Sequence, residues 1–139
     1  MSDFSIIDHT ADLGLKVRGE TLEKLFENAA GCMIRLAVKI PNSRPTETLE
    51  VHVSGSDLED LLVRWLGEIL YYFEGEKKIA TKTRITSISP QHLDATLQII
   101  RYDPALHELL SEIKAVTYHQ IRVSQKEDRV WKARVIFDL

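Results

Sequence analysis

The sequence is poor in several residue types, and each shortage excludes a class of protein. Its 139 residues include one cysteine, Cys32, which excludes an intrachain disulfide and a cysteine-rich zinc site. Six glycines and four prolines are too few for a fibrous or disordered chain. No stretch approaches the roughly 20 apolar residues of a membrane span, and no basic, apolar segment at the start marks a secretory signal. We therefore expect a cytoplasmic protein.

Charge of one sign is also lacking. The chain has 18 Lys and Arg against 21 Asp and Glu, so its formal net charge is -3. A free-standing nucleic-acid binder usually carries a basic excess, which this chain does not have. A chain of this length buries roughly two-thirds of its unfolded surface, and no linker divides it. We expect one domain over residues 1–139.

Apolar periodicity predicts the first half of the fold. Alternating apolar residues indicate short strands over 4–9, 13–19 and 49–53. From Thr21, a suitable N-cap, the apolar residues recur at helical spacing and place Cys32 in the core. A second helix is predicted to begin with the capping box Ser56-x-x-Glu59 and to stop at Gly75, and its broad apolar stripe is typical of a buried helix.

The second half returns mainly to strands. Residues 81–89 and 93–101 are predicted to form one hairpin, and residues 116–123 and 130–137 another. Between them, Asp103-Pro104 is typical of a helix start, so a short helix is predicted as far as Ile113. The expected fold is α+β: a single compact domain with a mostly antiparallel sheet of about seven strands, two main helices and one short helix.

Three polar segments at strand ends are the candidate functional residues, because the familiar phosphate-loop, dinucleotide, zinc and nucleophile motifs are absent. In the turn Asp8-His9-Thr10-Ala11-Asp12, carboxylates could converge on a hard cation, although Asp and Thr also cap their own backbone in turns. The chain ends on Asp138-Leu139, where a side-chain and a terminal carboxylate meet. With Asp12 these groups could bind a cation, or they could form an ordinary solvated strand end.

The third segment runs from Lys114 to His119. Alternation places Thr117 and His119 on one face of a strand, and Lys114 lies at its start, where an ammonium group can meet a phosphate or a carboxylate. The alternative is an exposed polar strand face. The remaining histidines are predicted to be surface residues, namely His52, His92 and His107.

Together these segments resemble the archease family over essentially the whole chain. Residues 8–14 are similar to the opening motif of that family, residues 21–30 to its first helix, and residues 137–139 to its chain end. The most distinctive match is Lys114-Ala115-Val116-Thr117-Tyr118-His119.

The resemblance implies an accessory protein rather than an enzyme. Archeases assist a GTP-dependent RNA ligase in tRNA splicing and RNA repair, and they promote its guanylylation and repeated turnover. The implied cofactor is a divalent metal ion, calcium in particular, held by Asp12, Asp138 and Leu139. A functional tip would comprise His9, Lys114 and His119. The implied partner is the ligase, with RNA contacted only indirectly and neither DNA nor a membrane involved.

Two other functions fit the same residues. In a metal-dependent phosphoesterase, Asp12 and Asp138 would hold the ion and His119 would act as general base. In a general protein-interaction or chaperone-like module, the metal would be purely structural.

Overall fold

The computed structural model describes residues 4–8 and 12–139 and contains two long helices among nine strands in these ranges. The elements in chain order are β1 (Phe4–Asp8), β2 (Asp12–Gly19), α1 (Leu22–Ala37), β3 (Val38–Lys39), β4 (Glu47–Ser54), α2 (Leu58–Glu76), β5 (Lys78–Ser89), β6 (His92–Arg101), β7 (Glu108–Leu109), β8 (Ala115–Gln125) and β9 (Trp131–Asp138). Within these residues, no helix is long and apolar enough to cross a membrane.

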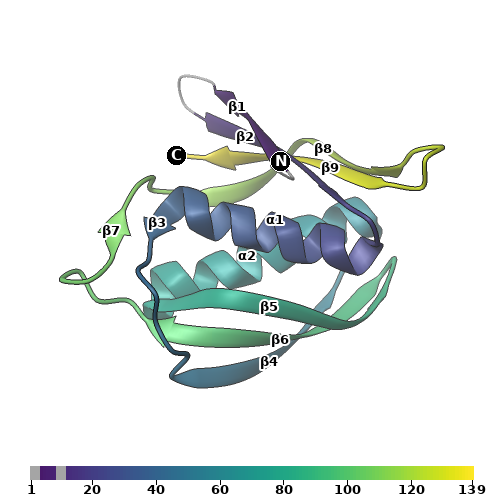
Figure 1. The fold of residues 1–139 in the computed structure, drawn as a ribbon. Helices are drawn as coiled ribbons and strands as arrows, with labels where there is room; N and C mark the ends of the chain where they lie inside the picture. The colour runs from purple at the N-terminus through teal and green to yellow at the C-terminus, as the bar shows by residue number, and fades with distance from the viewer. Residues whose placement is uncertain (1–3, 9–11) are drawn as a thin grey trace.

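The elements form three layers, with the helices in the middle (Figure 1). One sheet has the strand order β1-β2-β9-β8 and the other the order β4-β6-β5, and every pairing in them is antiparallel. Strands β3 and β7 form a separate two-stranded pair. Both helices contact both of the larger sheets. Each of these sheets therefore buries one face against the helices and leaves the other face open, so the predicted α+β domain is confirmed.

The core fills the space on both sides of the helix layer. Trp65 of α2 is fully buried, and its indole N–H donates to the carbonyl of Phe26 in α1, with 2.9 Å between the two atoms. Cys32 is buried as predicted. The broad apolar stripe of α2 is core packing, because one continuous cluster of buried residues includes both helices and both larger sheets.

Glycine allows each long helix to begin close to the strand that precedes it. A Cβ on Gly19, at the end of β2, would lie 2.4 Å from the backbone nitrogen of Leu25. A Cβ on Gly55, after β4, would lie 2.9 Å from the backbone nitrogen of Leu61. A larger residue would push the first turn of either helix away from its sheet.

The start and the end of α2 differ from the prediction by one or two residues. The N-cap is Asp57, whose carboxylate accepts from the backbone N–H of Asp60, while the Asp60 carboxylate accepts from the backbone N–H of Ser56. The predicted partner, Glu59, accepts instead from the backbone N–H of Val123 in β8. The helix passes Gly75 and ends at Glu76, and its C-cap, Lys77, adopts a left-handed conformation with φ 58°.

The predicted helix between Asp103 and Ile113 does not form. The carboxylate of Asp103 accepts from the backbone N–H of Ala105, and the following chain pairs with β3 as strand β7. The imidazole of His107 accepts from the backbone N–H of Asp103, and His107 is buried rather than on the surface. These side-chain bonds and the β3 pairing replace the few backbone bonds that so short a helix would gain.

Candidate functional site

Three of the sequence-predicted residues meet at one end of the four-stranded sheet. Strands β2 and β9 pair so that Asp12 lies directly opposite Asp138, and Asp138 lies opposite Ala115 of β8 on its other side. The backbone N–H of Lys114 donates to the carbonyl of Asp138 over 2.8 Å. The register of three strands therefore places two carboxylates and one lysine at the same sheet end.

In the part of the chain that the structure describes, neither Asp12 nor Asp138 forms an ion pair. Like charges on directly opposite residues of an antiparallel pair are destabilising. The Oδ1 atom of Asp12 is buried and has no hydrogen-bond partner there, and buried polar atoms are normally paired. An oxygen-only pair of this kind fits a hard cation such as calcium.

The strand register does not place the other predicted residues in this sheet-end group. Leu139 follows Asp138 directly and is exposed. His9 lies outside the described residues, as do Thr10 and Ala11 of the same turn. His119 is exposed, and its backbone N–H donates to the Thr117 hydroxyl over 3.3 Å.

His119 lies within a bulge of β8. The register with β9 is interrupted between Thr117 and Arg122, and Gln120 has a positive φ of 54°. The simple alternation that placed Thr117 and His119 on one face therefore stops at the bulge. Strand pairing brings Asp12, Asp138 and Lys114 together at the sheet end. His119 lies in the bulge of β8 and is not part of this group.

Tyr118 joins this bulge to the start of α2. Its hydroxyl donates to Oδ1 of Asp60 over 2.6 Å, and the same carboxylate is bound by Ser56 and Arg64. The Tyr118 bond is the largest of the contacts that hold the pKa of Asp60 far below its usual value. Asp60 is thus kept ionised as an anchor for the segment from Lys114 to His119.

Replacing Tyr118 with phenylalanine is expected to lower the free energy of unfolding by about 1 kcal/mol, the usual net contribution of one hydrogen bond. The pKa of Asp60 should rise toward its usual value. Urea denaturation and carboxyl NMR titration measure the two effects. Tyr71→Phe is the matched control, because Tyr71 is exposed and its ring packs edge-on against Tyr72; an equal loss in both variants would contradict the anchor role.

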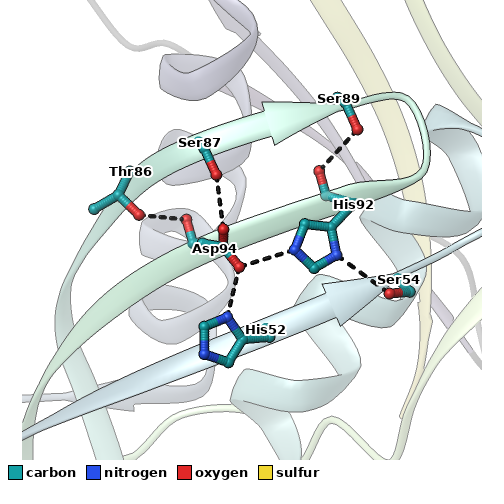
Figure 2. A network of polar contacts seen from close by, with 7 residues as sticks. All are labelled: His52, Ser54, Thr86, Ser87, Ser89, His92 and Asp94. Carbon is teal, nitrogen blue, oxygen red and sulfur yellow. Dashed lines mark hydrogen bonds and ion pairs between the residues drawn. The ribbon is translucent and has the colours of Figure 1, made fainter.

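A second polar cluster lies on the open face of the other sheet, and sequence analysis missed it (Figure 2). His52 of β4 faces Asp94 of β6 across the strand pair. The Oδ1 atom of Asp94 lies 2.5 Å from Nδ1 of His52 and 2.9 Å from Nε2 of His92. The hydroxyl of Ser87 donates to Oδ2 of Asp94 over 2.9 Å. The Nδ1 atom of His92 lies 3.3 Å from the hydroxyl of Ser54.

This triad of His52, His92 and Asp94 is a possible metal-binding group, since its ligand atoms lie within 4.8 Å of one another. Two imidazoles and one carboxylate suit zinc or a similar transition metal, whereas calcium prefers oxygen ligands alone. The triad and the Asp12–Asp138 pair therefore differ in the metal that each could take. His92 and Asp94 are close together on β6, but His52 lies 42 residues before Asp94, so no local motif predicted the triad.

In the absence of metal, the stabilisation that the triad contributes to the fold is expected to depend on pH. The hydrogen bond to Asp94 raises the pKa of His52, and the bonds from His52 and Ser87 lower the pKa of Asp94 to about 2. The stabilisation from Asp94 is present above its ordinary pKa of 3.8 and is lost as the pH falls through about 2. The stabilisation from His52 is complete below its ordinary pKa of 6.5 and is lost as the pH rises through its raised pKa.

NMR titration of the imidazole carbons in the presence of EDTA measures the His52 pKa directly. Asp94→Asn should lower the His52 pKa toward its ordinary value, because the largest cause of the rise is removed. Glu50→Gln, which removes a weaker charge effect on the same histidine, should lower it less. An unchanged His52 pKa in Asp94→Asn would show that the carboxylate does not hold the imidazole.

The fold and the first of these clusters define a class of protein: a small three-layer α+β domain with a candidate all-oxygen cation site at one sheet end. Residues 4–139 match the family model described as "Archease protein family (MTH1598/TM1083)". The chain therefore belongs to the archease family.

Individual relatives agree with this assignment. The chain is 34% identical to the protein archease of Methanosarcina acetivorans, covering 98% of this chain and 95% of that one. It is 30% identical to the protein archease of Pyrococcus furiosus, with 100% of both chains covered.

Two solved structures are also similar. The solution structure of protein 1598 from Methanobacterium thermoautotrophicum matches with a TM-score of 0.81 and 32% identity, over 100% of both chains. The crystal structure of an archease described as a possible chaperone, from Thermotoga maritima, matches with a TM-score of 0.67. The match covers 96% of this chain and 94% of that one. Because the identity is only 24%, this second likeness supports the fold alone.

Proposed function

We propose that this protein is an accessory protein, rather than an enzyme, that activates a GTP-dependent RNA ligase in tRNA splicing and RNA repair. Membership of the archease family supports the proposal. The structural observation that carries it is the meeting of Asp12, Asp138 and Lys114 at one sheet end, where Oδ1 of Asp12 has no partner among the described residues.

The proposed tip combines a cation site with a positive side chain. Asp12 and Asp138 would hold a divalent metal ion, calcium in this proposal, together with the carboxylate of Leu139. Such an ion supplies positive charge that neutralises the facing carboxylates. The backbone bond from Lys114 to Asp138 ties the lysine backbone to the same strand end, and we propose that its ammonium group meets a phosphate or a carboxylate of the ligase.

The role proposed for this tip is to promote guanylylation of the ligase and so to restore it after each ligation. His9 and His119 are proposed to complete the tip. The partner is the ligase itself, RNA is reached through it, and the setting is the cytoplasm.

Ligase labelling with radioactive GTP tests this role. Adding the protein should raise the rate at which the ligase becomes guanylylated, and Lys114→Ala should remove most of the increase while the urea midpoint stays unchanged. Lys77→Ala is a control, because this lysine caps the C-terminal end of α2 and is not part of the four-stranded sheet. Identical labelling rates with and without the protein would contradict the proposal.

The phosphoesterase alternative is less well supported, because His119 lies in the β8 bulge rather than among the paired residues at the sheet end. Incubation of the protein alone with a model phosphodiester separates the two functions. We expect no hydrolysis, and turnover that depends on His119 would favour the phosphoesterase.

A further inference from the structure

The open face of the four-stranded sheet contains a basic groove at the end away from Asp12 and Asp138. Its volume is about 870 Å³, and none of its described lining residues is acidic. The groove contains one-third of the 18 Lys and Arg of a chain whose net charge is -3. Its cationic residues are Lys16, Arg18, Arg122, Lys126, Lys132 and Arg134.

The strand register places these cations side by side. Arg134 of β9 lies opposite Lys16 of β2 and also opposite Arg122 of β8, so one row across three strands is entirely positive. In the next row on the same face, Lys132 lies opposite Arg18. Directly opposed like charges destabilise a sheet, so the face is arranged for an anion that offsets this repulsion.

The interactions of the groove residues support the same conclusion. Among the described residues, Lys16, Arg122, Lys132 and Arg134 form no ion pair with a carboxylate. One guanidinium nitrogen of Arg134, Nη2, donates to Oε1 of Gln120 over 2.6 Å. Its Nε atom is buried and without a partner in this part of the chain. Arg134 is therefore held in place while its charge remains uncompensated.

We infer that this groove binds the phosphate backbone of a single-stranded polynucleotide. The cations extend from β2 across β9 to Lys126 beyond the end of β8. Neighbouring strands are about 4.8 Å apart, so this spread exceeds what one phosphate group needs. Long cationic side chains along a groove are the usual means of following a nucleic-acid strand.

Other anions fit the groove less well. A nucleoside triphosphate normally carries Mg²⁺, which needs oxygen ligands, and the described lining offers no carboxylate. The aromatic ring of Phe4 packs against the core and lies 5.9 Å from the guanidinium of Arg35 in α1. The described lining has no other aromatic residue on which bases could stack. The groove is therefore expected to contact phosphates alone and to bind independently of base sequence.

A groove that binds RNA directly differs from the indirect RNA contact that the family resemblance implies. A net charge of -3 averages over the molecule, whereas the register concentrates positive charge on one face. Lys16 lies four residues along β2 from Asp12, which corresponds to about 13 Å. A strand in the groove would therefore lie close to the candidate cation site on the same sheet.

Fluorescence anisotropy with a labelled ten-nucleotide oligouridylate tests the groove in the absence of any ligase. The wild-type protein should bind at 50 mM salt. If three phosphates are contacted, affinity should fall by about 20-fold at 200 mM, since each contact contributes about -0.7 to the logarithmic salt slope. The double variant Arg122→Gln/Lys132→Gln should bind about tenfold or more weakly and show a smaller slope.

The control is Lys82→Gln/Arg84→Gln, which removes the same charge from exposed positions of β5 on the other sheet. It should bind as the wild type does. Equal weakening in both double variants, or no binding by the wild type at 50 mM salt, would overturn the inference. Inorganic triphosphate that competes at lower concentration than unlabelled oligouridylate would also overturn it and would assign the groove to a nucleotide. Because ligation is measured separately, either proposal can fail alone.

Discussion

Replacing Asp12 with alanine is expected to abolish the stimulation of the ligase while leaving the fold intact. The substitution removes one of the two facing carboxylates at the ends of β2 and β9 and takes away the oxygen that lacks a partner among the described residues. Mutation of residues that support metal ligands typically weakens metal binding by roughly 10- to 100-fold. Loss of a ligand itself should weaken calcium binding by at least as much. Calorimetric calcium titration and a ligation assay measure both effects.

Stability should not fall in this variant. Removing one of two opposed negative charges relieves repulsion, so the apo protein should have an unchanged or slightly higher urea midpoint. Glu50→Ala is the matched control, because it removes an exposed carboxylate from the other sheet. Full stimulation by Asp12→Ala would contradict the proposed role of this carboxylate.

Trp65→Ala is expected to cause the largest loss of stability of any substitution considered. The side chain is fully buried among helices and sheets, and truncation of a large buried aromatic residue costs about 3–5 kcal/mol. The carbonyl of Phe26 would also lose its bond to the indole, which adds to the cost. Urea denaturation followed by circular dichroism measures the change.

The matched control for this second prediction is Trp131→Ala. Trp131 is only partly buried at the start of β9, so its truncation should cost distinctly less. Equal losses in the two variants would show that the helix layer is not the centre of the core. A variant too unstable to purify can be replaced by Trp65→Phe, for which a smaller loss in the same direction is expected.

The parts of the fold that follow from local pattern were predictable. The apolar stripe of α2 spans many turns, so its burial could be read from spacing alone. The first residue of α2 could not be predicted, because Ser56 and Asp57 are both suitable N-caps. Which of them caps the helix depends on the partners that Asp60 and Glu59 find. The false helix after Asp103 had helical spacing, but a contact with β3, distant in sequence, overrode it.

The candidate site was predictable only in part. Asp12 and Asp138 were each placed at a strand end, yet their direct pairing depends on the register between β2 and β9. The β8 bulge leaves no trace in the alternation of residues 116–123, so the position of His119 could not be foreseen. The same holds for the His52–Asp94 contact and for the basic row, because both join residues across strands.

The proposed role of this protein is to enable a GTP-dependent RNA ligase to act repeatedly. The most direct measurement counts the ligation products formed per ligase molecule at limiting ligase and saturating GTP, with and without the protein. We expect about one product per ligase alone, and many when the protein is present with calcium. A ligase that turns over equally well in both reactions would contradict it.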